Sequence, residues 1–525
     1  MSGRLHVLMV AAENDGIAGA KVGGIADVTR DVPLALVDSA ADRRVTSVIP
    51  CHGFLHRLPS ARWVDSFGFS FRGRGDYADV YEIEGKTKHK NIRHLVIRCG
   101  GESSRIHRLY HDDPPGRPFA SDADKFARFG AAVAAWIEQG RIDPSHLHLH
   151  DWHAAFVLIL RRYAADDSPL KRLPTAFTIH NLAYQGIRPL RGESSALESW
   201  HPGLPYRLSD IGDPRFRDWR GDPQCVNPMA AGIRLADRVH VVSPTYAREI
   251  QRPSYPSEGF YGGEGLERDL QQADHEGRLF GILNGCYYHD QRKPLARSLR
   301  SYQELLKLAQ TETTKRIPSD RPAHDLAMNR INQWLAEPSR PTVLMTAVTR
   351  VVHQKVALMC GPGRPALDRV LEALDSNARL ILLGTGDPYY EELLQNLSRG
   401  RPGFLFLPMH SPQIADALYD NGDLFLMPSS YEPCGISQML AMRAGQACVV
   451  HGVGGLADTV RDGVTGYVFN GNTMAAQADA FVDCVARAVS DGKQGRLAAL
   501  GRAAAAERFL WSDSIRRYFD HLYVG

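Results

Sequence analysis

The segment Pro428 to Gly435, Pro-Ser-Ser-Tyr-Glu-Pro-Cys-Gly, decides the fold class of this chain. The apolar run Leu424 to Met427 precedes it, and apolar residues at helical spacing follow it as far as Gly445. This order predicts a buried strand, a sharp turn and a short helix. Ligands of α/β proteins bind at the carboxyl ends of parallel strands, so Glu432 in the bend is a candidate site residue.

A second segment of the same kind lies downstream. Residues 454–458, Gly-Gly-Leu-Ala-Asp, follow the apolar strand Ala447 to Val450. Alone, the Glu-Pro-x-Gly pattern is more often a structural turn, but two adjacent strand ends rich in free backbone N–H groups favour an anion site. The run PSSYEPCGISQMLAMRAG followed by GGLADTV resembles the C-terminal domain of bacterial glycogen synthases and plant starch synthases.

Composition sets bounds on the function. A chain of 525 residues predicts two or three domains, and 62 basic against 59 acidic residues give no field that favours nucleic acid or a membrane surface. Eight cysteines without a Cys-x-x-Cys pair argue against zinc ribbons and a disulfide framework. We expect a cytoplasmic protein whose first residues form a strand and which has no membrane span.

The N-terminal region has the pattern of a nucleotide-binding fold. The strand His6 to Ala12 leads into a glycine-rich loop and a helix, an order that many α/β proteins share. The loop reads KVGGIADV and is similar to the family's Lys-x-Gly-Gly-Leu-x-Asp-Val signature. The resemblance implies that Lys21, Gly23 and Gly24 bind the donor diphosphate and that Asp27 lies near the sugar or the acceptor.

Two histidine motifs follow in the first half. His146, His148 and His150 alternate on one strand, so they form either a zinc site or, as we favour, a packed core, because no fourth ligand is evident. The string continues Asp-Trp-His, and the resemblance places Asp151 near the reacting sugar. In FTIHNLAYQG the resemblance makes His180 the active-site histidine, in contact with the glucose 6-hydroxyl.

A basic pair marks the second half. Arg350 and Lys355 flank a strand-to-helix turn. Either they belong to a solvated basic loop, or their side chains bind a diphosphate from two sides. The pair resembles the phosphate-binding Ser-Arg-Leu-x-x-Gln-Lys-Gly motif of the family, although Val356 replaces its last glycine. A Gly-Pro-Gly sequence at 361–363 should interrupt the following helix and place Lys355 less favourably.

The remaining candidates come from the resemblance. His410 stands where the family places an adenine-stacking tyrosine, and His451 and Val453 replace its basic residue and threonine. Tyr287 replaces an expected aspartate, and residues 291–341 are longer and more polar than the family's connection, with a helix around 323–335. The full set of predicted donor-binding residues is Lys21, Gly23, Gly24, Asp27, Gly384, His410, Cys434, Gly435, Ser437, Gly454 and Gly455; the predicted catalytic residues are Asp151, His180, Arg350, Lys355 and Glu432.

The resemblance implies a GT-B glycosyltransferase with two Rossmann-like domains that face each other across a cleft. We expect an N-terminal domain at 1–255, a donor-side domain at 256–507 and a terminal helix at 508–525 that packs back on the first domain. The implied reaction transfers glucose from ADP-glucose to the non-reducing end of an α-1,4-glucan with retention of configuration and without a metal or cofactor. Two alternatives stay open: a related enzyme that uses UDP-glucose or another donor, and a non-catalytic glucan-binding homologue.

Overall fold

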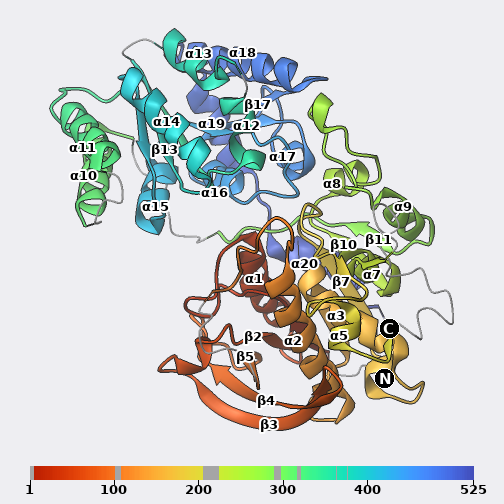
Figure 1. Cartoon of the computed structure of the whole chain (residues 1–525). Helices are drawn as coiled ribbons and strands as arrows, with labels where there is room; N and C mark the ends of the chain where they lie inside the picture. The colour runs from red at the N-terminus through yellow and green to blue at the C-terminus, as the bar shows by residue number, and fades with distance from the viewer. Residues whose placement is uncertain are drawn as a thin grey trace. The chain divides into compact units, whose positions relative to one another are not determined.

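The computed structural model describes residues 5–100, 108–204, 224–288, 297–315, 321–361, 363–374 and 377–524. The chain forms two compact units, each with its own sheet (Figure 1). Unit 1 comprises Met1–Pro253, Gly263–Gly285 and Trp511–Gly525, and unit 2 comprises Ser254–Gly262 and Cys286–Leu510. Within the described ranges, no helix has the length and apolar character that a membrane crossing requires.

The sheet of unit 1 has nine strands in the order β11-β10-β7-β6-β1-β2-β5-β4-β3. Its strands are parallel except for the antiparallel pairs β3 with β4 and β4 with β5. The central strands are buried on both faces, as a parallel sheet between helices requires, and β6, β7 and β10 carry buried polar as well as apolar residues. The bounds are β1 (His6–Val10), β2 (Arg44–Pro50), β3 (Arg62–Phe71), β4 (Arg74–Ile83), β5 (Ile92–Cys99), β6 (His146–His150), β7 (Thr175–Ile179), β10 (Arg238–Val241) and β11 (Leu279–Gly281), with a separate pair β8 (Arg188–Pro189) and β9 (Cys225–Val226).

The helices of unit 1 pack their apolar residues into the core around the sheet. The apolar spacing of residues 122–136 predicts an amphipathic helix, and α2 is present and slightly longer, with Phe126, Phe129 and Ala132 in the core. The bounds are α1 (Gly24–Ser39), α2 (Ala120–Glu138), α3 (Asp151–Tyr163), α4 (Pro169–Arg172), α5 (Leu197–Trp200), α7 (Pro228–Leu235), α8 (Pro244–Glu249), α9 (Glu267–His275) and α20 (Trp511–His521).

The last helix, α20, returns to unit 1 and packs against α1. The indole Nε1 of Trp511 donates to Oδ2 of Asp31 at 3.3 Å, and both side chains are buried. A Cβ atom at Gly285 would lie 2.5 Å from the backbone nitrogen of Trp511. Any residue larger than glycine at position 285 would therefore clash with the start of α20.

Unit 2 contains a six-stranded parallel sheet in the order β14-β13-β12-β15-β16-β17. Its strands are short, apolar and buried, which confirms the strands predicted before residues 428 and 454. The strands are β12 (Val343–Val348), β13 (Ala378–Leu383), β14 (Phe404–Leu407), β15 (Leu424–Met427), β16 (Ala447–His451) and β17 (Gly466–Phe469); the helices are α10 (Leu299–Thr314), α11 (Arg321–Leu335), α12 (His353–Cys360), α13 (Ala366–Ala373), α14 (Pro388–Gly400), α15 (Pro412–Asn421), α16 (Ser437–Arg443), α17 (Gly454–Thr459), α18 (Met474–Lys493) and α19 (Leu497–Ala506).

The polar segment 291–341 holds more structure than the sequence predicted. Its helix around 323–335 is present as α11, but α10 was missed, and the two helices lie side by side, drawn in green in Figure 1. Tyr302, Leu305, Leu306 and Ala309 are buried at helical spacing and join a core cluster with β12, β13 and β14. Residues 291–296 and 316–320 of this segment fall outside the described ranges.

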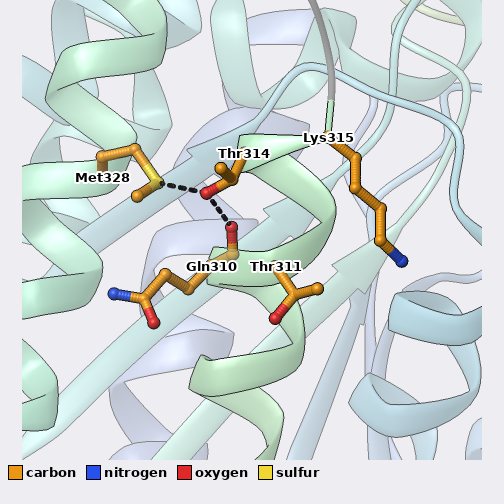
Figure 2. A pocket seen from close by; sticks show the side chains of 5 residues that line it. All are labelled: Gln310, Thr311, Thr314, Lys315 and Met328. Carbon is orange, nitrogen blue, oxygen red and sulfur yellow. Dashed lines mark hydrogen bonds between the residues drawn. The ribbon is translucent and has the colours of Figure 1, made fainter.

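A hollow of about 380 Å³ lies on this helix pair (Figure 2). Thr314 of α10 donates from Oγ1 to the carbonyl of Gln310 at 2.8 Å and lies 4.0 Å from the sulfur of Met328. Thr311 and Lys315 complete its lining, so none of the predicted site residues takes part in it.

We predict that Gly285→Ala destabilises unit 1, because the new methyl group must displace the backbone of Trp511. Forcing such a contact into a packed region costs about 1–3 kcal/mol, which a lower urea midpoint would report. Gly116→Ala is the matched control, because a Cβ there has nothing within 4 Å. Equal midpoints for the two variants would contradict the expectation.

Candidate functional site

The centre of the candidate site in unit 2 is a buried ion pair. Glu432 lies in the turn between β15 and α16, and Lys355 lies in the first turn of α12. The Lys355 ammonium contacts Oε2 of Glu432, and the Ser429 hydroxyl donates to the same oxygen at 3.0 Å. Only 12% of the Lys355 side chain and 6% of the Glu432 side chain are exposed. Two of the predicted catalytic residues are thus in direct contact.

Backbone contacts tie the two segments together. The Gln354 side chain donates from Nε2 to the carbonyl of Tyr431 at 3.0 Å, and the Ser430 amide donates to the Gln354 carbonyl at 2.9 Å. Val356 is fully buried, and α12 ends at Cys360 as predicted for the Gly-Pro-Gly interruption. With these departures in place, Lys355 contacts Glu432, and Gln354 one residue earlier bonds the same loop.

The second glycine segment packs directly on the first. A Cβ at Gly454 would lie 1.8 Å from the carbonyl oxygen of Glu432, and one at Gly455 would lie 2.2 Å from that of Cys434. The Gly455 amide donates to the Glu432 carbonyl at 3.0 Å. Only glycine permits this approach, so the structure brings the two predicted motifs together at one edge of the sheet. Gly435 has a φ of 78°, Cys434 is buried, and Ser437 begins α16 half-buried.

Three further predicted residues follow β12, β13 and β14. Gly384 packs against the backbone of Thr349, where a Cβ would lie 1.9 Å from the carbonyl oxygen. This contact holds the segment that carries Arg350. Arg350 is exposed, and its guanidinium forms no ion pair or hydrogen bond with any described residue, which leaves it able to bind an anion. His410 is exposed three residues beyond β14.

The departure at His451 has a structural explanation. His451 is buried at the end of β16, shares a hydrogen bond of 3.0 Å between Nδ1 and the carbonyl of Ser429, and stacks on Phe469 at 5.2 Å. Burial lowers the pKa of His451, so the neutral ring donates to that carbonyl. Because Ser429 also bonds Glu432, His451 supports the loop that carries the buried carboxylate.

In unit 1 the predicted lysine and aspartate form part of a charged cluster. The ammonium of Lys21 lies 2.6 Å from Oδ1 of Asp27 and 3.4 Å from Oδ2 of Asp15. Arg30 contacts both of these carboxylates, and Lys86 reaches Asp15 at 2.6 Å. Arg30 also pairs with Asp31 at 2.5 Å, so three cationic side chains and three aspartates meet at the start of α1.

Glu13 is a site residue that the sequence reasoning missed. Its Oε2 accepts hydrogen bonds from the amides of Val22 at 2.5 Å and Gly23 at 2.8 Å, and its Oε1 accepts one from Tyr110 at 3.1 Å. The Gly23 amide that the resemblance assigned to a diphosphate therefore holds a carboxylate here, whereas a Cβ at Gly24 would have nothing within 4 Å. An acidic residue between a strand and a glycine-rich loop was the available signal.

Asp151 and His180 lie at neighbouring strand ends and contact each other. Oδ1 of Asp151 accepts a hydrogen bond from the His180 amide at 2.7 Å. Asp151 has a φ of 56°, an uncommon conformation for this residue type that is concentrated at functional sites. Burial raises the pKa of Asp151 to about 8, and the charge of Glu13 adds to the shift, so the carboxyl is protonated at neutral pH.

The histidines of β6 pack rather than converge on a metal. His150 shares a hydrogen bond of 2.9 Å with His180, and His148 bonds Tyr523 and Thr178. Burial lowers the pKa of His180 to about 3, so this ring is neutral. Across the part of the chain that the structure describes, no group of three His, Cys, Asp or Glu residues is arranged to hold a metal ion.

Two Rossmann-like domains, each built on a largely parallel sheet with glycine loops at its strand ends, are the architecture of GT-B glycosyltransferases. The chain matches the starch synthase catalytic domain family over residues 6–272 and the group 1 glycosyl transferase family over residues 363–491. It belongs to the glycogen synthase and starch synthase family and is a hexosyltransferase.

Individual relatives are similar in sequence to this chain over most of its length. It is 33% identical to glycogen synthase of Desulfitobacterium hafniense over 84% of this chain and 82% of the relative. It is 34% identical to glycogen synthase of Gloeobacter violaceus over 87% of this chain and 84% of that one. The catalytic domain of starch synthase IV from Arabidopsis thaliana, solved with ADP and acarbose, has the same fold with a TM-score of 0.77 at 23% identity, covering 99% of each chain.

We predict that Asp151→Asn stabilises the protein progressively as the pH rises. The folded wild type keeps a proton up to a pKa of about 8, whereas the unfolded chain loses it near the ordinary value of 3.8, so wild-type stability falls between these values. The amide has no proton to lose. Urea denaturation at about pH 5 and about pH 8 should show the advantage of the variant grow by on the order of 3–4 kcal/mol.

The control for this measurement is Asp143→Asn, because Asp143 is exposed. A difference between Asp151→Asn and wild type that is the same at both pH values would mean that the Asp151 carboxyl is ionised in the folded protein.

Proposed function

We propose that this hexosyltransferase moves glucose from ADP-glucose to the non-reducing end of an α-1,4-glucan and retains the anomeric configuration. The observation that carries the proposal is the contact between Lys355 and Glu432 beside the Gly454-Gly455 segment. It joins a buried cation, a buried carboxylate and a glycine-rich backbone, which are the groups that a sugar diphosphate requires. The relatives that are named glycogen synthases support the substrate class.

Glu432 is suited to bind the donor sugar. Both hydrogen bonds that it accepts from described residues reach Oε2, which leaves Oε1 for a sugar hydroxyl. A carboxylate in this position also offsets the positive charge that develops on the sugar ring as the bond to phosphate breaks. The contact with Lys355 places an opposite charge beside this buried carboxylate.

Cationic side chains are needed to stabilise the negative charge of the departing diphosphate. We assign this role to Arg350, whose guanidinium has no partner among the described residues, and to Lys355, whose ammonium has further N–H groups beyond the one that faces Glu432. Lys21 of the glycine loop is the third candidate. No carboxylate is assigned as a nucleophile, so we infer attack of the acceptor hydroxyl from the same face, with the departing phosphate taking its proton.

Asp151 and His180 are assigned to the reacting sugar. A protonated Asp151 is a hydrogen-bond donor and acceptor at neutral pH, so it can bind a hydroxyl group without repelling the diphosphate. The neutral imidazole of His180 can likewise bind a hydroxyl group, which fits contact with the 6-hydroxyl of glucose.

The donor is tested by a panel of nucleotide sugars with a maltooligosaccharide acceptor. We expect turnover with ADP-glucose, and a fall of about 10²–10³ in kcat for Glu432→Gln, which keeps the shape but loses the charge. Turnover with UDP-glucose and none with ADP-glucose would support the alternative donor. The variant Glu392→Gln, an exposed residue of α14, controls for a general effect of charge removal.

Phosphate binding is tested by calorimetry with ADP. We expect Arg350→Ala and Lys21→Ala each to weaken binding about tenfold or more, because a charge-assisted hydrogen bond contributes about 1.5–3 kcal/mol. Arg399→Ala and Lys88→Ala are the matched controls, since both residues are exposed and form ion pairs or hydrogen bonds only with nearby residues of their own units. Wild-type affinity in Arg350→Ala would remove its phosphate role.

A further inference from the structure

A continuous line of buried polar side chains, joined by hydrogen bonds, crosses the sheet of unit 1 on the strands next to His180. His148, Thr178 and His240 are fully buried on the adjacent strands β6, β7 and β10. His148 shares hydrogen bonds with the Tyr523 hydroxyl at 2.7 Å and with the Thr178 hydroxyl at 2.6 Å. The Thr178 hydroxyl also bonds His240 at 2.9 Å, and His240 bonds the carbonyl of Ile282 at 3.2 Å.

The carbonyl of Ile282, at one end of this line, determines which atom carries the proton in each of its hydrogen bonds. Ile282 can only accept, so Nε2 of His240 carries the proton, and its Nδ1 must accept from the Thr178 hydroxyl. The Thr178 oxygen then accepts from Nε2 of His148, and Nδ1 of His148 accepts from the Tyr523 hydroxyl. Burial lowers the pKa of both histidines, to about 4 for His240, which keeps each ring neutral with a single proton. Every hydrogen bond in this line is therefore donated in the same direction, from Tyr523 toward Ile282.

The line reaches the candidate site through His150. The rings of His148 and His150 stack at 4.4 Å, and Nδ1 of His150 lies 2.9 Å from Nε2 of His180. Nε2 of His150 is buried and has no partner among the described residues. A proton on that nitrogen would be an unsatisfied buried donor, so the His150 proton lies on Nδ1 and is donated to His180. His180 must then carry its own proton on Nδ1.

We propose that Tyr523, Thr178 and His148 are positioning residues: their hydrogen bonds fix the ring of His148, the stacked His150 ring is held against it, and His150 in turn holds His180 as the Nδ1–H tautomer in one orientation. The inference rests on the proposed role of His180 in sugar binding. His180 then presents a hydrogen-bond donor to a sugar oxygen, and Tyr523, which lies just beyond the last helix of the chain, contributes to the site without touching the substrate.

The alternative is that this line is an ordinary buried network that only stabilises the core. Stability alone does not separate the two possibilities, because each predicts a less stable variant when a hydroxyl is removed. The protonation pattern of His180 and the division between kcat and KM do separate them, since a purely structural network has no reason to change either.

The test uses two pairs of variants in the full-length protein. Tyr523→Phe removes the donor at the start of the line, and Tyr518→Phe is its control, because Tyr518 is equally buried beside His148 and His240 but its hydroxyl forms none of these bonds. Thr178→Val removes the central hydroxyl at constant shape, whereas Thr178→Ser keeps it. NMR of the imidazole nitrogens in isotope-labelled histidine reports the tautomers, and the signal that disappears in His180→Asn identifies His180.

We expect His180 to appear as the Nδ1–H tautomer in the wild type and to shift or broaden in Tyr523→Phe and Thr178→Val but not in Tyr518→Phe. The same two variants should lose about tenfold in kcat with little change in KM, the size expected for one lost hydrogen bond in a positioning network. Thr178→Ser should recover kcat relative to Thr178→Val.

An Nε2–H tautomer at His180, or equal effects of Tyr518→Phe and Tyr523→Phe, would overturn the inference. If the wild type does not use ADP-glucose, the proposed donor is wrong, but the NMR comparison needs no substrate and still decides whether the line positions His180.

Discussion

The buried contact between Lys355 and Glu432 is the constraint around which the second unit is arranged. An isolated charge at this depth would cost several kcal/mol, and removal of one partner from a buried pair typically costs about 3–5 kcal/mol. Three segments that are distant in sequence must therefore meet at one place: the start of α12, the turn before α16 and the Gly454-Gly455 segment. Glycines at that meeting point are required by the approach of backbone to backbone.

In unit 1 the partners of the buried carboxyl groups differ from the cation that contacts Glu432 in unit 2. Burial raises the pKa of Glu13 and of Asp151, and neither has a cation as its nearest partner. Backbone amides and the Tyr110 hydroxyl satisfy Glu13, and the His180 amide satisfies Asp151. Neutral donors thus satisfy these two buried carboxyl groups of unit 1, whereas a cation contacts the buried carboxylate of unit 2.

Much of the fold followed from local patterns. The strands before residues 428 and 454 and the helix at 122–136 are short, strongly apolar or periodic, so their own residues specify them. Helix α10 was missed because its charged and polar residues outnumber the buried ones, and its apolar face becomes evident only against β12, β13 and β14. The contact between Lys355 and Glu432 was not predictable from a local pattern because it spans 77 residues.

By itself the sequence determined the parallel α/β class and the identity of the residues at the strand ends, because these depend on spacing along the chain, and its motifs carried the resemblance to the family. The tertiary structure alone decided which oxygens and nitrogens face one another. It placed Glu13 on the Gly23 amide, His451 beneath the turn that carries Glu432, and a carbonyl of Ile282 at the end of a line of neutral histidines. Such pairings depend on distances of about 3 Å between segments far apart in sequence, which no local pattern encodes.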